Sequence, residues 1–236
     1  MKPVQRSTTG LFHAIAILLP WLGVAVFTIN IEPVKAGVGL TLLLICAKCY
    51  LNTGLFIVAH DSMHGTLSPS WPQINKAIGA VALFLYAGLN YSSCKRKHLL
   101  HHLAPETSLD PDYRKEHEAS FVKWFARFLC SYTSVGSLVI LGLGWILVYS
   151  QSVDPFRSLI LFGAIPLVLS SIQLFTFGIW MPHKPGKGSV QNTPRSSYFP
   201  PIVSLLTCYN FGYHREHHEN PHVPWYQLYR IAMAKI

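Results

Sequence analysis

Charged residues are scarce in this chain of 236 residues, because Asp, Glu, Lys and Arg together make up only 12% of it. A typical soluble protein has roughly 25%. Half of the residues are apolar, and the mean hydropathy is +0.31. So few charges exclude an ordinary cytosolic domain, a disordered chain and a fibrous repeat. The composition predicts a small integral membrane protein, and we expect residues 1–236 to form a single membrane-embedded domain.

Acidic residues and cysteines are also few. Ten acidic residues accompany nineteen Lys and Arg, which gives a formal net charge of +9. The apolar composition argues against a nucleic-acid partner, since basic residues of membrane proteins gather on the cytoplasmic side. The five cysteines are odd in number and lie partly in apolar runs, so no disulfide framework is expected. Cys46 and Cys49 have redox or metal spacing, but their apolar surroundings favour packing.

Four apolar segments are long enough to cross a hydrocarbon core of ~30 Å, which takes about 20 helical residues. They are residues 11–31, 37–59, 131–150 and 156–180. Short links join them into two helical hairpins. The first segment lacks a convincing cleavage site and is expected to be a span, not a signal peptide. Two shorter apolar runs, 77–91 and 199–212, are expected to form interfacial or re-entrant helices.

The basic residues predict the orientation of these spans. If the N-terminus is cytoplasmic, only Lys35 and Arg157 lie near the outer side and only Lys48 lies within a span. The other basic residues then lie on the cytoplasmic side, as the positive-inside rule requires. We therefore expect an all-α, multi-pass membrane protein with four transmembrane helices and both termini in the cytoplasm. Lys48 should snorkel or face the bundle interior, because a charge in the bilayer is costly.

Histidine is in surplus, with twelve residues against ten acidic ones. Eight of them form three compact groups: His60 and His64 (H-x3-H), then His98, His101 and His102 (H-x2-H-H), then His214, His217 and His218 (H-x2-H-H). Residues three or four apart share one face of a helix, so each group can direct at least two imidazoles at one point. In the predicted topology all three groups lie at the cytoplasmic face, which favours a shared metal centre over separate packing roles.

The remaining histidines receive different predictions. His183 follows the fourth span and is expected to be a ninth ligand. His222, four residues after the third group, is a candidate for a contact behind the ligands or with a substrate. His117 lies in a polar run and is expected to be solvated, and His13 begins the first span and is expected to be interfacial.

Eight or nine imidazoles are too many for one metal ion and suit two. Imidazole binds zinc, copper, iron and nickel, and two iron ions with four or five imidazoles each would keep positions open for dioxygen. These ligands are neutral, so we expect acidic side chains to hydrogen-bond the rings from behind and orient them. The candidates near the groups are Asp61, Asp110, Asp112, Glu216 and Glu219, with His222 as a neutral one.

Three such histidine boxes on four spans resemble the membrane fatty acid desaturase and hydroxylase superfamily. The chain is similar in particular to bacterial β-carotene ketolases of the CrtW type, over nearly its whole length from the first span. The similarity rests on residues 60–65, 110–112, 192–197, 204–218 and 224–226. The stretch 204–218 is the specific part, whereas the boxes alone indicate only the superfamily. Tyr226 departs from the family pattern, in which a second tryptophan is common at this position.

The resemblance implies a histidine-bound di-iron centre that uses dioxygen and an external electron donor. It implies ketolation at C4 of a β-ionone ring, through two hydroxylations at one carbon and loss of water from the geminal diol. β-Carotene would become echinenone and then canthaxanthin. A carotenoid hydroxylase or a lipid desaturase on the same site is an alternative. A histidine-rich membrane metal transporter is a more distant alternative. A transporter would place polar residues along a path inside the spans, and these spans contain few of them.

A carotenoid is a long apolar substrate dissolved in lipid, so its end ring needs an apolar path to the metal centre. The aromatic and apolar residues near the predicted site that could line it are Phe56, Phe84, Tyr86, Leu89, Tyr91, Phe175, Phe177 and Trp180. The basic run Lys95-Arg96-Lys97 could dock an acidic donor such as ferredoxin. The positive-inside rule alone also explains that run.

Overall fold

A computed structural model describes residues 7–113, 120–184 and 193–235, and within these residues the chain is entirely helical. His117 lies outside the described residues. In chain order the α-helices are α1 (Ser7–Ile29), α2 (Pro33–Met63), α3 (Pro72–Ala87), α4 (Tyr91–Leu103), α5 (Phe121–Tyr132), α6 (Val135–Tyr149), α7 (Pro155–Ser158), α8 (Ile165–Phe175), α9 (Met181–His183), α10 (Pro201–Cys208), α11 (His214–Glu219) and α12 (Leu228–Met233). Two π-helical turns, η1 (Leu159–Ala164) and η2 (Thr176–Trp180), and a 3-10 turn, η3 (Trp225–Gln227), complete them.

Three helices are long and apolar enough to cross a membrane: α1, α2 and the continuous rod Pro155–His183 that runs from α7 through α9. They correspond to the predicted segments 11–31, 37–59 and 156–180. Helix α2 extends beyond its predicted C-terminal end and finishes at Met63. His60 therefore lies in the last turn of α2 and His64 caps it, whereas the sequence placed both after the span. The first histidine box thus lies at the C-terminal end of the long apolar helix α2.

The predicted span 131–150 differs from the structure. The helix breaks at Thr133 and Ser134, and α5 meets α6 at an angle of 87°. Ser134 and Ser137 form a reciprocal capping box, in which each hydroxyl oxygen accepts the other residue's backbone N–H at 3.1 and 2.8 Å. This local capping stabilises a helix start inside an apolar run. Helices α3 and α4 form a second bent pair, at 99°. Length and composition thus allow three crossings by single helices, or up to five if each bent pair counts as one.

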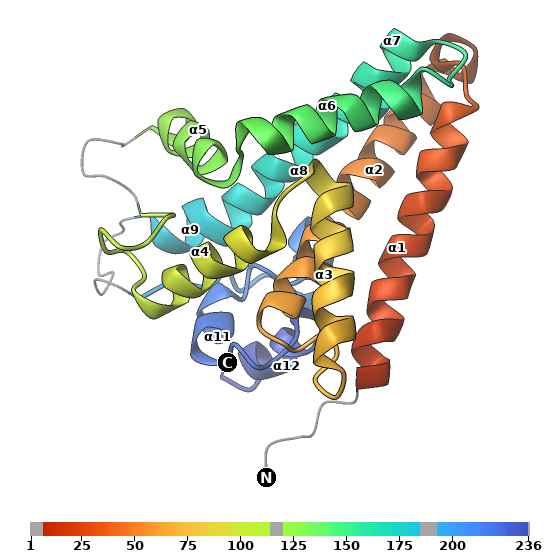
Figure 1. Cartoon of the computed structure of the whole chain (residues 1–236). Helices are drawn as coiled ribbons and strands as arrows, with labels where there is room; N and C mark the ends of the chain where they lie inside the picture. Colours follow the sequence, from red (N-terminus) through yellow and green to blue (C-terminus); the bar gives the residue numbers. More distant parts are fainter. Residues whose placement is uncertain (1–6, 114–119, 185–192, 236) are drawn as a thin grey trace.

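Helix α2 lies at the centre of the bundle and packs against α1, α3 and α8 (Figure 1). Its contact with α3 is close, because a Cβ atom at Gly79 would overlap the Ser62 side chain. The Ser62 hydroxyl donates to the Asn75 backbone oxygen at 2.6 Å, and the Asn75 amide donates back to the Ser62 carbonyl at 2.7 Å. These bonds fix the C-terminal end of α2, which carries His60 and His64, against the start of α3.

The C-terminal segment folds back onto the histidine-bearing end of the bundle. Tyr209 and Asn210 follow α10 with φ of 47° and 64°, and this left-handed pair turns the chain toward α11. The ring of Tyr209 stacks on Tyr50 of α2 at 4.4 Å, and each hydroxyl donates to a backbone oxygen on the other segment. The C-terminal half of α4 also reaches this end, beside α11 (Figure 1). The ends of α2, α4 and α9 therefore meet α11 at this end of the bundle.

Candidate metal centre

Nine histidines converge at this end of the bundle in two groups. Within each group, one nitrogen per residue lies within 4.8 Å of all the others. The five-histidine group consists of His60, His64, His98, His102 and His217, and the four-histidine group of His101, His183, His214 and His218. The structure therefore brings together all nine of the residues that were predicted as ligands.

The Nε2 atoms of the five-histidine group point at one another. The Nε2 separations are 3.1 Å between His60 and His217, 2.7 Å between His64 and His98, and 2.9 Å between His102 and His217. Imidazole nitrogens bind first-row transition-metal ions at about 2.1 Å, so two nitrogen ligands at a right angle around one ion lie about 3.0 Å apart. The spacing of this group fits a metal ion among the rings.

The four-histidine group has the same spacing. Its Nε2 separations are 3.0 Å between His183 and His214, 3.0 Å between His214 and His218, and 3.1 Å between His101 and His218. Because all these contacts involve Nε2, the Nδ1 atoms remain for other partners. The donor set, spacing and burial of both groups fit two adjacent metal ions.

Helical periodicity decides which histidine joins which group. On α4, His98 and His102 are four residues apart and enter the five-histidine group, while His101 enters the other. On α11, His214 and His218 are four apart in the four-histidine group, while His217 belongs to the first. Adjacent helical residues diverge by ~100°, so each helix directs imidazoles to both groups.

Three of the predicted carboxylates lie behind the rings. Both carboxylate oxygens of Asp110 lie 3.0 Å from His101 Nδ1, and Asp112 Oδ2 lies 3.8 Å from the same atom. Asp61 Oδ1 lies 3.4 Å from His60 Nδ1, while its other oxygen accepts the Trp225 backbone N–H at 3.3 Å. A carboxylate at Nδ1 holds the ring so that the Nε2 lone pair is directed at the metal position.

Glu106 also lies behind a histidine ring, although it was not predicted from the sequence to do so. Its Oε1 atom lies 3.2 Å from His183 Nδ1, so the four-histidine group has carboxylates behind two of its rings. Glu106 lies in the loop after α4 with φ of 59°, and its backbone N–H donates to Asp110 Oδ2 at 3.0 Å. The only available signal was an acidic residue just after the second box, because His183 is 77 residues away in the chain.

The other three predicted orienting residues have different surroundings. Glu216 is fully buried, but it accepts hydrogen bonds from Ser196 and Tyr198 and pairs with Lys235. Glu219 pairs with Arg215 at 2.8 Å and with Lys235 at 2.5 Å. His222 is exposed and belongs to neither histidine group. No contact in the described part of the chain joins Glu216 or Glu219 to a ring of the two groups. Glu216 instead ties α11 to the chain before α10 and to Lys235, and Glu219 pairs with the same lysine.

Burial keeps His64 and the three histidines of α11 neutral, whereas for His101 the hydrogen bond with Asp110 outweighs burial and raises the pKa. Burial lowers the pKa of His64 to about 4, and the nearby Lys95 charge adds to this. Burial, reinforced by neighbouring imidazoles, also lowers the pKa of His214, His217 and His218 well below its usual range. Neutral imidazole is the form that binds metal ions.

The acidic residues respond to burial differently. Burial would raise the pKa of Asp110, but hydrogen bonds from His101 and from two backbone N–H groups lower it below its ordinary value. Burial raises the pKa of Asp112 to about 6. Asp110 is therefore the more acidic of the two carboxyl groups beside His101.

Comparison with known proteins agrees with this histidine pattern. The family model described as "Fatty acid desaturase" matches residues 36–160 and 133–235. The chain belongs to the fatty acid desaturase family. It is 38% identical to a "Beta-carotene ketolase" of Paracoccus sp. (strain PC1), over 91% of this chain and 88% of that protein. It is 37% identical to a "Beta-carotene ketolase" of Paracoccus sp. (strain N81106 / MBIC 01143), over 97% and 94% of the two chains.

An algal relative shows the same similarity. The "Beta-carotene 4-ketolase 3" of Haematococcus lacustris is 35% identical, over 96% of this chain and 80% of that protein. The resemblance expected from the sequence, both to the desaturase superfamily and to β-carotene ketolases, is confirmed.

In this desaturase-family protein, the side chains predicted to line a substrate path do not form one surface. Phe84 and Tyr86 line a cavity of about 350 Å³ between the helices. Leu89 and Tyr91 are buried in the main core, against which Phe56 and Phe177 pack. Phe175 and Trp180 instead join a separate aromatic cluster with α5. The bend between α5 and α6, which the sequence did not predict, makes this cluster possible.

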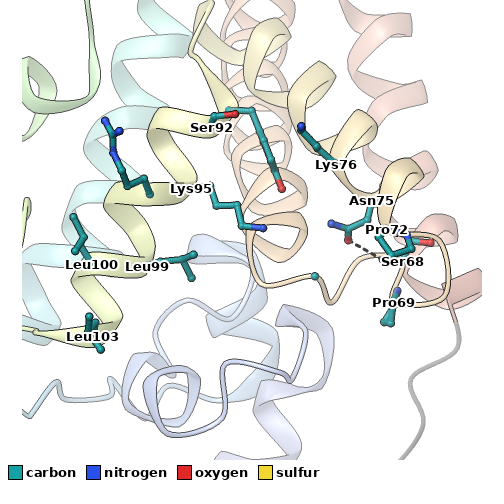
Figure 2. A pocket seen from close by; sticks show the side chains of 13 residues that line it. Ser68, Pro69, Pro72, Asn75, Lys76, Ser92, Lys95, Leu99, Leu100 and Leu103 are labelled. Atoms are coloured by element: carbon teal, nitrogen blue, oxygen red, sulfur yellow. Dashed lines mark hydrogen bonds between the residues drawn. The ribbon is translucent and has the colours of Figure 1, made fainter.

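A groove of about 800 Å³ lies between the start of α3 and the outer face of α4 (Figure 2). Lys76, Lys95 and Arg96 line it, with no acidic residue among its lining side chains. Figure 2 shows Lys95 extending from α4 toward α3. The groove also includes Gly65 and Leu99, which directly follow His64 and His98 in the chain. A cationic surface therefore lies beside the five-histidine group.

Proposed function

We propose that this protein is a membrane di-iron oxygenase that introduces a keto group at C4 of carotenoid β-ionone rings. The observation that supports it best is the arrangement of nine imidazoles in two adjacent groups, with carboxylates behind three rings. The relatives named β-carotene ketolase support the choice of substrate and reaction. β-Carotene would give echinenone and then canthaxanthin.

Two bound iron ions would supply dioxygen activation. Each of two rounds would use one dioxygen, two electrons and two protons to hydroxylate C4, and would release one water. The resulting geminal diol would then lose water to leave the ketone. The five- and four-histidine groups would each hold one ion. Asp61, Asp110 and Glu106 would keep protons on Nδ1 of His60, His101 and His183, so that Nε2 faces the metal. Burial of His214 and His217 excludes bulk water from the inner side of both groups.

We also propose four membrane crossings, with α6 as the fourth beside α1, α2 and the rod Pro155–His183. The exposed apolar side chains of α6, including Leu138, Leu143 and Leu147, support contact with lipid. Fifteen helical residues extend only about 22 Å, so the ends of α6 would lie near the headgroups. Four crossings place the histidine groups and both termini on the cytoplasmic side, in agreement with the basic residues.

The electrons would come from an acidic carrier protein such as a ferredoxin. The groove lined by Lys76, Lys95 and Arg96 is the surface that we assign to it, because its charge complements such a carrier. The adjacency of Gly65 to His64 and of Leu99 to His98 supports a short path from the groove to the five-histidine group.

Expression in a β-carotene-accumulating host, followed by pigment chromatography, tests the function. We expect keto-carotenoids from the wild-type chain, loss of all ketone in His217→Ala, and retention of ketone in the control His222→Ala. Hydroxylated or desaturated products without a ketone would favour the alternative enzymes of this family. Purified protein that contains zinc in place of two irons, and has no oxygenase activity, would favour a metal transporter.

A further inference from the structure

Lys48 is an ammonium group inside the membrane bundle. It lies in the middle of α2, and only 6% of its surface is exposed. It makes no ion pair and no hydrogen bond within the described part of the chain, and the centroid of the Trp21 ring lies 6.0 Å from Nζ. A charge within a membrane segment is costly, so its retention points to a ligand or a function.

The side chain of Lys48 lines the cavity of about 350 Å³ between α1, α2, α3, α6 and the rod Pro155–His183. The walls are mainly aromatic and aliphatic, including Phe84, Trp145 and Phe162. No lining residue is acidic. A long apolar molecule could therefore enter this cavity from the lipid, but nothing in the walls neutralises the ammonium.

Hydrogen-bond donors are in excess in this cavity. Asn52 also lines it, and its Oδ1 already accepts the Trp21 indole N–H at 2.8 Å. The two Asn52 amide N–H groups have no partner among the described residues, and Lys48 adds three more N–H donors. A matching ligand must bring an acceptor oxygen, and it needs no donor of its own.

The distance to the metal centre indicates which molecule fits. Lys48 and His60 are twelve residues apart on α2, about 18 Å along the helix axis. The side chains of Lys48 and His60 both lean toward the N-terminus of α2, so this axial separation also applies approximately to the two side chains. A carotenoid, about as long as the ~30 Å hydrocarbon core is thick, is longer than this separation. With one ring near the histidines, it therefore extends into this cavity.

We propose that Lys48 and Asn52 form a binding site for the ring ketone of a carotenoid that has already been oxidised at one end. Lys48 donates a hydrogen bond to the ketone oxygen, and the unmodified ring then lies at the histidine end for the second ketolation. This inference rests on the proposed function. It adds a residue pair that favours the monoketone over β-carotene, which has no acceptor oxygen.

The test uses the full chain in lipid nanodiscs, with echinenone as the probe and β-carotene as the ligand without a carbonyl. We expect the carbonyl stretch of echinenone, measured by Raman spectroscopy, to shift to lower frequency on binding the wild type. In Lys48→Met the shift disappears and echinenone binds about tenfold more weakly, while Lys48→Gln, which keeps a donor, retains part of both. The control Lys35→Met makes the same change at an exposed position of α2 and leaves both unchanged.

In cells, the ratio of diketone to monoketone should fall about tenfold in Lys48→Met. Echinenone that binds with an unshifted carbonyl in the wild type, or equally well to Lys48→Met, overturns the proposal. The proposal is also overturned if Lys48→Met weakens the binding of oleate but leaves the binding of echinenone unchanged, since a lipid carboxylate is then the ligand. Loss of the proposed function is distinguishable, because a chain that makes no ketone can still be titrated with added echinenone.

Discussion

His101 and Asp110 form a closely matched pair at the metal centre, with His101 Nδ1 3.0 Å from each carboxylate oxygen. The pair is buried on both sides. Asp110 also accepts the backbone N–H groups of Asp112 and Glu106, at 2.8 and 3.0 Å. One carboxylate thus orients an imidazole of the four-histidine group and organises the loop after α4.

Asp110→Asn removes this charge with little change in volume. An amide holds the imidazole less firmly, so we expect about 10- to 100-fold weaker iron binding and a similar loss of ketolation. Iron content after dialysis against a graded chelator measures the effect. Glu219→Gln is the matched control, because Glu219 pairs with Arg215 and Lys235 at the surface. Equal loss of iron in both variants would contradict the role of Asp110.

Glu106→Gln tests the carboxylate behind His183. Glu106 Oε1 lies 3.2 Å from Nδ1 of His183, a member of the four-histidine group, so the two metal positions should respond unequally. We expect bound iron to fall from two toward one per chain under mild chelation, with the five-histidine position retained. Mössbauer spectroscopy of ⁵⁷Fe-loaded protein separates the two positions, and simultaneous loss of both irons would count against the assignment.

Charge reversal in the groove tests the electron-donor surface. Lys95→Glu should weaken the binding of an acidic plant-type ferredoxin about tenfold at low salt, because like charges then face each other. The difference should shrink at high ionic strength, where screening acts over a few ångströms. Arg230→Glu, an exposed position on α12 outside the groove, is the control. A titration that shows equal weakening in both variants would indicate only a general effect of net charge.

The metal-free protein should lose stability as the pH falls. The folded-state pKa of His64 is about 4, against an ordinary 6.5, and those of His214, His217 and His218 are also lowered. Below pH 6.5 the unfolded chain binds protons that the folded chain refuses, so the free energy of unfolding falls by up to ~1.4 kcal/mol per pH unit for each such histidine. Thermal unfolding between pH 8 and pH 4 measures this. A midpoint that stays constant below pH 6.5 would contradict neutral buried imidazoles.

Local patterns in the sequence were enough for much of this protein. The apolar runs predicted three of the long helices. The i, i+3 and i, i+4 spacing predicted eight of the nine histidines that converge, and the position of His183 after a span predicted the ninth. Helical periodicity is a property of neighbouring residues, so the sequence alone determines which imidazoles of one box share a face. Asp61, Asp110 and Asp112 were predicted because they lie near the histidine boxes in the sequence.

Long-range packing decided the rest. Periodicity separates the histidines within α4 and within α11, but which of these faces joins His60 and His64 and which joins His183 depends on how the helices pack. Glu106 meets His183 only because two distant segments fold together, whereas Glu216 turns toward Ser196 because the histidines occupy the other side of α11. The break at Ser134 was hidden by an apolar run in which capping hydrogen bonds outweigh helix continuation. The sequence supplied the donor atoms, and only the tertiary structure assigned each of them to a metal position.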